Sequence, residues 1–184
     1  MSDIKEGYLR VTECLQKYNN FDKIPALVLH NASDRGTKVH RLAELHMLGE
    51  YFPEPDKELL GYLKSFQGWY DTMVSKLIST EERFYDDVLM LTGCVDIVAV
   101  LKGDKAPTII DIKTPSTESK TWKLQLAMYR QLFNTQKDTK GKAERRIALK
   151  LDKNGKLPKI YEYTNHEQDL KLYMSALELH RYFQ

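Results

Sequence analysis

Two short segments rich in Val and Ile, residues 95–101 and 108–112, constrain the fold of this 184-residue chain most strongly. Each is bounded by turn residues, which is typical of a β-strand. The intervening segment, Lys102–Lys105, contains Gly103 and has the composition of a hairpin turn. We therefore expect an antiparallel pair of strands, in which each polar side chain has a defined face and a defined neighbour.

Two aspartates and a lysine lie on this predicted pair. Asp111 and Lys113 are two residues apart, so both side chains project from one face of the strand. Ile110 and Ile112 point to the opposite face and can be buried. Asp96 lies near the start of the preceding strand, where it can meet Asp111 across the pair. Carboxylate oxygens suit Mg²⁺ or Mn²⁺, and the Ile112 carbonyl offers a neutral ligand. An ion held there would assist phosphodiester hydrolysis, although a strand-borne Asp and Lys also fit a solvent-exposed salt bridge.

The rest of the pattern predicts helices on both sides of these strands, hence an α/β (α+β) chain with a central mixed sheet flanked by helices. No repeat or linker is visible, so we expect a single domain over 1–184, with a helical part at about 1–78 and a sheet core at about 79–184. The predicted elements are a helix capped by Ser33 or Asp34 and ended by Gly49, a helix from Asp56 to Leu77, a strand at 84–91, a helix at 119–133, a hairpin of 147–151 and 160–163, and a closing helix at 170–182.

The charge distribution favours a polyanionic partner more than the total charge does. The net charge is only +2, but residues 102–146 carry 11 Lys and Arg against 5 Asp and Glu, a net of +6. A basic segment around two candidate acids is what a phosphate-backbone binder would show. A solvated loop and helix face would have the same composition.

Composition also bounds the class of protein. No apolar run of about 18 residues is present, so a membrane span is not expected. The N-terminal residues lack the basic and apolar regions of a secretory signal. Cys14 and Cys94 are far apart, which predicts neither a disulfide framework nor a metal knot. We expect a cytoplasmic protein.

Three further features accompany the acids. Gln125 and Tyr129 are four residues apart on the helix after the second strand, so they share one face. His40 lies in an earlier predicted helix, with Glu44 one turn along, and could complete a coordination shell. Glu81 precedes the strands. Each feature alone is also compatible with an ordinary surface or core position.

Together these residues resemble the PD-(D/E)XK nuclease superfamily, in particular its RecB-like exonuclease branch, which includes phage-type and mitochondrial genome-maintenance exonucleases. The resemblance runs from about residue 33 to 130 and depends on motif order. The ordered motifs are Gly36–His40, Glu81, Gly93–Asp96, Asp111–Lys113 and Gln125–Tyr129. The Pro of the superfamily name is missing, and so are the cysteines that hold an iron–sulfur cluster in some relatives, so no such cluster is expected.

The resemblance implies a restriction-endonuclease-like core and a role for each matched residue. It implies one or two Mg²⁺ or Mn²⁺ ions held by His40, Asp96, Asp111 and the Ile112 carbonyl, and a catalytic Lys113. Glu44 and Glu81 would bind a second ion or support the metal ligands. Substrate or scaffold contacts would come from Gln125, Tyr129, Thr114 and Arg35.

The function implied is a metal-dependent DNA exonuclease of recombination, replication or repair, in the host cytoplasm if phage-encoded. Single- or double-stranded DNA is the expected partner, with an oligomer or a recombination or replication protein as a further one. Two alternatives remain open: a silent nucleic-acid-binding or assembly module on a nuclease fold, and a restriction-type endonuclease.

Overall fold

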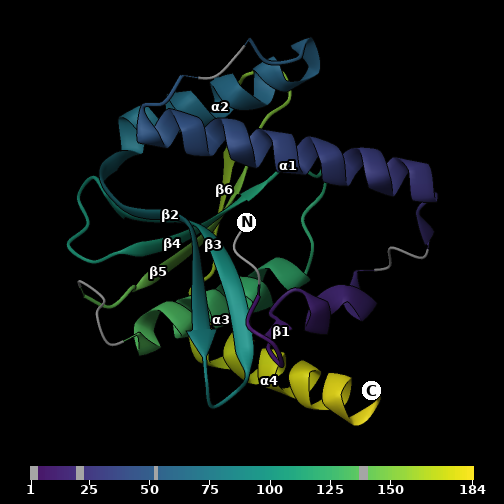
Figure 1. The fold of residues 1–184 in the computed structure, drawn as a ribbon. Coiled ribbons are helices and arrows are strands. Elements are labelled where there is room, and N and C mark those ends of the chain that lie inside the picture. The colour runs from purple at the N-terminus through teal and green to yellow at the C-terminus, as the bar shows by residue number, and fades with distance from the viewer. Residues whose placement is uncertain (1–3, 20–22, 52–53, 137–140) are drawn as a thin grey trace.

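A mixed β-sheet lies between two layers of helices in the computed structural model, which describes residues 4–19, 23–51, 54–136 and 141–184 (Figure 1). The strands are β1 (Leu9–Arg10), β2 (Val74–Asp86), β3 (Leu91–Leu101), β4 (Thr108–Lys113), β5 (Arg145–Lys150) and β6 (Lys159–Glu162). The helices are η1 (Glu13–Tyr18), α1 (Ala26–Leu48), α2 (Lys57–Met73), α3 (Thr121–Thr135) and α4 (His166–Tyr182). The predicted fold class, a central mixed sheet flanked by helices, is confirmed.

The sheet has the order β1-β3-β4-β5-β6, and β2 also pairs with β3. The β2–β3, β3–β4 and β5–β6 pairs are antiparallel, whereas β1–β3 and β4–β5 are parallel. The predicted hairpins of β3 with β4 and of β5 with β6 are therefore both present. A parallel pair needs a crossover connection, and α3 supplies it between β4 and β5.

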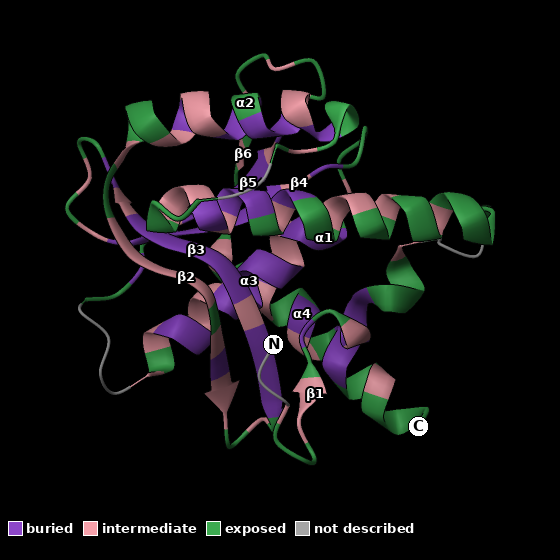
Figure 2. Cartoon of the chain, turned by 45° about the horizontal axis from the view of Figure 1, so that its top comes forward, coloured by how far each residue is buried: buried purple, intermediate pink, exposed green. Residues whose placement is uncertain are grey.

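The core consists of two apolar clusters, one on each face of the sheet (Figure 2). Strand β4 shows why two clusters form, because its successive side chains alternate between the faces. Ile109 packs with residues of α3 and α4, whereas Ile110 and Ile112 pack with residues of α1 and α2. The predicted burial of Ile110 and Ile112 is thus confirmed.

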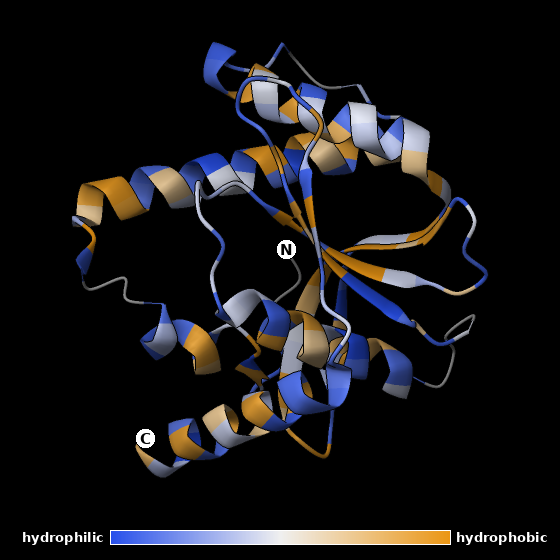
Figure 3. Cartoon of the chain, turned by 180° about the vertical axis from the view of Figure 1, so that it is seen from behind, coloured by the Kyte–Doolittle hydropathy of each residue, from blue (hydrophilic) through white to orange (hydrophobic). Residues whose placement is uncertain are grey.

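Helix α3 lies against one face of the sheet and α4 packs on α3, and apolar and polar stretches alternate along the helices (Figure 3). In the described part of the chain, no helix combines the length and the apolar character needed to cross a membrane.

Several predicted boundaries are wrong. Helix α1 begins at Ala26, not at Ser33 or Asp34. The Val28 and Leu29 amides donate to the Pro25 carbonyl, so the first helical turn forms upstream without a capping side chain. Helix α2 ends at Met73 rather than Leu77, and β2 covers Val74–Asp86 rather than 84–91. Pairing of β2 along nearly all of β3 overrides the helical spacing of its apolar residues.

Candidate functional site

The polar site lies where β4 separates from β3. The last backbone pair between these strands is Ile97–Ile110, so Asp96 and Asp111 occupy the next position on each strand. Beyond it, the Ile112 amide donates to Asp96 Oδ2 at 2.6 Å in place of a ladder bond. Asp96 and Asp111 are only 6% and 2% exposed. The divergence of the two strands therefore creates a buried pocket of acceptor atoms around the two aspartates.

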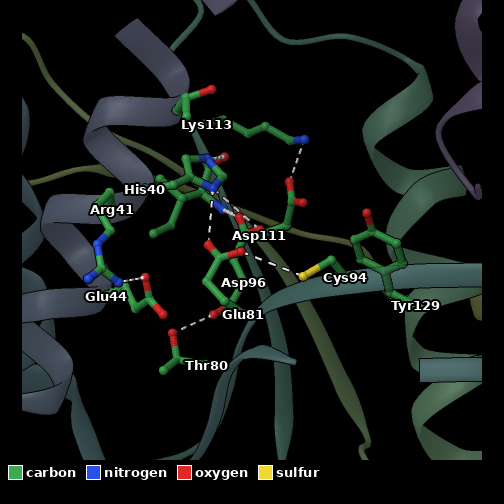
Figure 4. Close-up of polar contacts among 12 residues, drawn as sticks. His40, Arg41, Glu44, Thr80, Glu81, Cys94, Asp96, Asp111, Lys113 and Tyr129 are labelled. Carbon is green, nitrogen blue, oxygen red and sulfur yellow. Dashed lines mark hydrogen bonds and ion pairs between the residues drawn. The ribbon is translucent and has the colours of Figure 1, made fainter. Parts of the chain in front are cut away.

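His40 reaches this point from α1. Its neighbours Val39, Leu42 and Ala43 are buried against the sheet, which fixes the face that His40 presents. His40 Nε2 lies 3.1 Å from the Ile112 carbonyl oxygen, and Nδ1 lies 3.4 Å from Asp96 Oδ1 (Figure 4). The structure thus places His40 beside Asp96 and the Ile112 carbonyl.

Glu81 approaches from β2, on the other side of β3. Its backbone has φ +48°, a left-handed value that is uncommon for a residue other than glycine. Glu81 Oε1 lies 3.5 Å from His40 Nδ1, and Glu81 Oε2 accepts from Cys94 Sγ at 3.6 Å. The neighbouring Thr80 hydroxyl donates to the Asp96 carbonyl at 3.0 Å. The unusual backbone of Glu81 therefore coincides with a carboxylate directed at the site.

His40, Glu81 and Asp96 form a compact donor set for a cation. Their ligand atoms all lie within 4.8 Å of one another, and no other group of this kind occurs among the residues that the structure describes. The Ile112 carbonyl oxygen lies 3.1 Å from His40 Nε2, whereas both carboxylates face Nδ1 of the same ring. Two carboxylates and an imidazole fit a divalent ion such as Mn²⁺ or Mg²⁺. Asp111 is not part of the compact set, although Asp96 is its neighbour across the sheet.

Asp111 belongs instead to a hydrogen-bonded chain that includes Lys113. Lys113 Nζ forms an ion pair with Asp111 Oδ2 and donates to Gln125 Oε1 at 3.0 Å. Gln125 Nε2 contacts Asp111 Oδ1 at 3.1 Å and the Tyr129 hydroxyl at 3.0 Å. Gln125 therefore holds the D-x-K pair from α3, and Tyr129, on the same helix face, supports Gln125.

The pKa values reflect burial and the close spacing of these charges. Burial raises the pKa of Asp111 to about 6, with Asp96 adding to the shift and Lys113 opposing it. The pKa of Asp96 is lowered, because His40 and Lys113 outweigh its burial. Burial would lower the pKa of His40, but Asp96 and Glu81 raise it well above its usual value. A site that stabilises positive charge on His40 also favours a cation at the same place.

The other predicted residues lie around this centre. Thr114 is buried at the end of β4, and its hydroxyl lies 3.8 Å from the position a Cβ would take at Gly36. The guanidinium carbon of Arg35 lies 6.0 Å from the Tyr62 ring of α2, so Arg35 packs between the helices. Glu44 forms an ion pair with Arg41 and is not part of the compact donor set.

A cleft of about 640 Å³ opens over the donor set from the α1 side. Sequence reasoning missed two of its cationic side chains, Arg41 and Arg83. Arg83 could have been found if β2 had been predicted at its true length, because Glu81 and Arg83 are two residues apart in that strand. The lining residues are Gly36, Thr37, His40, Arg41, Glu44, Glu81, Arg83 and Cys94.

The predicted basic footprint over 102–146 is only partly available to a ligand. Arg146 is 1% exposed and donates to Asp169 Oδ2 at 2.7 Å. Arg145 pairs with Asp104 and Glu162. Arg130 donates to the Ala143 carbonyl at 2.7 Å. These three arginines hold the fold together, while Lys137 and Lys140 lie outside the described residues.

Comparison with known proteins adds an independent finding. A family model described as the PD-(D/E)XK nuclease superfamily matches residues 57–180, which include β2, β3, β4 and α3 but not His40 of α1. The chain is also similar to a solved structure described as "Crystal structure of SSO0001", with 17% identity and a TM-score of 0.47. That alignment covers 97% of this chain and 79% of the other. No curated protein matches the chain.

Proposed function

Because the chain belongs to the PD-(D/E)XK nuclease superfamily, a superfamily of metal-dependent nucleases, we propose that it is a deoxyribonuclease that removes nucleotides from DNA ends. The observation that carries the proposal is the convergence of Asp96, Asp111 and Lys113 with His40 and Glu81 at the β3–β4 divergence. The exonuclease assignment depends on the motif order that resembles the RecB-like branch. Recombination, replication or repair of DNA is the corresponding role.

The residues that would hold the metal are His40, Glu81, Asp96 and the Ile112 carbonyl, with Asp111 adjacent. When bound, Mg²⁺ or Mn²⁺ supplies Lewis-acid polarisation of the scissile phosphate and acidifies nearby water. Asp96 is buried and already directed at this place, because the Ile112 amide donates to its Oδ2 and His40 Nδ1 lies 3.4 Å from its Oδ1.

Lys113 is the proposed catalytic residue. Its ammonium is held between Asp111 and Gln125, so it cannot swing freely into solvent. A fixed positive charge beside the attacked phosphate stabilises the negative charge that develops on the phosphoryl oxygens in the transition state. The same ammonium can orient the attacking water through a hydrogen bond. Asp111 and Gln125 act in this scheme by holding Lys113 in place.

Digestion of end-labelled linear and closed circular DNA, with Mg²⁺ or Mn²⁺, tests the proposal. The native chain should release short products from linear DNA and leave the circle intact. Asp111→Asn and Lys113→Ala should lose cleavage, whereas Lys171→Ala, at an exposed position on α4, should not. Full activity in folded Asp111→Asn and Lys113→Ala proteins would refute the proposed site. Cleavage of the closed circle would instead favour a restriction-type endonuclease, and binding without any cleavage would favour a silent module.

A further inference from the structure

Three lysines form a row across the sheet beside the candidate site. Lys113 of β4 is opposite Lys150 of β5, and Lys150 is opposite Lys159 of β6. Side chains at opposed positions of neighbouring strands project from the same face. The lysine row (Lys113, Lys150, Lys159) therefore begins at the D-x-K motif and ends on the edge strand.

The position of the neighbouring row identifies the face. Asp111, Ala148 and Tyr161 are opposed on the same three strands, and Ala148 and Tyr161 pack in the cluster beneath α3 and α4. The lysines lie two residues away from these positions along each strand, so their side chains project from the same face. The row is thus the continuation of the surface that carries Asp111.

Aromatic rings support the two ends of the row. Lys113 Nζ lies 5.6 Å from the Trp122 ring centroid, and Lys159 Nζ lies 4.4 Å from the Tyr161 ring centroid. The Trp122 and Tyr161 rings meet edge to face with centroids 5.9 Å apart. The rings thus lie beside the ammonium groups of Lys113 and Lys159 and attract these positive charges.

The row is an arrangement that the fold alone does not favour. Like charges directly opposite each other on a sheet are destabilising. Lys113 is paired with Asp111, but no acidic ion-pair partner of Lys150 or Lys159 occurs within the described ranges. The adjoining arginines of β5 are neutralised, Arg145 by Asp104 and Glu162 and Arg146 by Asp169. The arginines of β5 are therefore paired within the protein, whereas Lys150 of the same strand can bind an external anion.

We propose that the lysine row binds the phosphate backbone of the nucleic-acid strand on one side of the scissile bond. If the chain is a nuclease as proposed, the substrate strand leaves the site along these three lysines. Strands lie about 4.8 Å apart, so the row spans about 10 Å. Each strand of a B-form duplex presents one phosphate per 3.4 Å or so of helix axis, so a row of this length aligned with the axis would face about three of them. The partner chemistry is a continuous polyphosphate backbone rather than a single anion.

The test measures binding of an end-labelled oligothymidylate by fluorescence anisotropy in EDTA, at several salt concentrations. The double variant Lys150→Gln/Lys159→Gln should bind about tenfold more weakly at 0.1 M salt or so, and its slope of log K against log salt should be smaller by about 1.4. Lys150→Arg/Lys159→Arg should keep the native slope. Lys76→Gln/Lys171→Gln, at exposed positions on β2 and α4, is the matched control and should also keep it.

Cleavage by the native chain is measured alongside, so that the two ideas fail separately. An unchanged salt slope in the double glutamine variant overturns the lysine row, whether or not the native chain cleaves. A reduced slope with no cleavage by the native chain supports the lysine row and refutes the nuclease. If the salt slope fell equally in the Lys150/Lys159 variant and in the Lys76/Lys171 control, the effect would be one of overall charge, and the inference would also be overturned.

Discussion

A Cβ atom at Gly93 would lie 2.7 Å from Cε1 of Tyr129, closer than such atoms approach one another in folded proteins. Gly93 of β3 therefore leaves room for the Tyr129 ring. The Tyr129 hydroxyl contacts Gln125 on the same helix, and Gln125 in turn contacts Lys113 and Asp111. The glycine of G-x-x-D and the tyrosine of Q-x-x-x-Y are two halves of one contact. Their separation in sequence conceals a direct packing relationship.

Replacement of Gly93 by Ala should destabilise the chain and reduce catalysis. The added methyl group must displace the buried Tyr129 ring, which costs about 1–3 kcal/mol in an overpacked core. Unfolding in urea and cleavage rates measure the two effects. Gly68→Ala is the control, because its Cβ would lie 3.4 Å from the Leu157 side chain and alanine favours the α2 helix. A Gly93→Ala protein with the native free energy of unfolding would show that the Tyr129 ring can move aside without destabilising the fold.

Glu81 should contribute more to metal affinity than Glu44. Glu81 belongs to the compact donor set, whereas Glu44 is paired with Arg41. Glu81→Gln should weaken Mn²⁺ binding by about tenfold or more in calorimetry, and Glu44→Gln should change it little. Equal losses in the two variants would contradict the assignment of Glu81 to the donor set.

Gln125→Ala should lower the single-turnover cleavage rate while DNA binding stays near native. The amide holds both Lys113 and Asp111, and a displacement of about 1 Å in a catalytic group can cost up to about 10²-fold in rate. Tyr129→Phe removes only one hydrogen-bonding hydroxyl and should have a smaller effect. A rate in Gln125→Ala that matches Tyr129→Phe would show that the amide does not position Lys113.

The centre of the candidate site follows from strand periodicity alone. Asp111 and Lys113 share a face, Ile110 and Ile112 are buried on the other, and Asp96 and Asp111 directly follow the last backbone pair of β3 and β4, Ile97–Ile110. These relations depend on local spacing and on one hairpin register, which a sequence specifies well. His40 was placed by motif order, because no local pattern on α1 indicates which strand it faces. Its role as a ligand stays a prediction.

Other parts of the site depend on tertiary contacts that no local pattern encodes. Glu81 of β2 has a left-handed backbone, which glutamate does not favour, and its carboxylate points at His40. The apolar residues Val74 and Leu77 continue the spacing of α2 but pair with β3 instead. Long-range pairing decides both features, so the role of Arg83 in the cleft could not be seen before the register of β2 was known.

His166, at the start of α4, should make the fold sensitive to acid. Burial and the charges of Arg130 and Arg146 lower its pKa to about 4, and nearby Asp169 only partly opposes them. An unfolded chain protonates His166 near pH 6.5, whereas the folded chain keeps it neutral to about pH 4. The unfolded state thus binds the extra proton first, and stability falls as the pH drops through this window.

His166→Gln should remove part of this loss. Since His166 is partly exposed, solvent screening limits the effect, and the fall in Tm between neutral and mildly acidic pH should shrink by about 2–4 °C. Differential scanning fluorimetry across that window measures the change, at low protein concentration and without added metal. His30→Gln, at an exposed position on α1, is the control and should keep the native slope. If His166→Gln also kept the native slope, His166 would not be the source of the acid sensitivity.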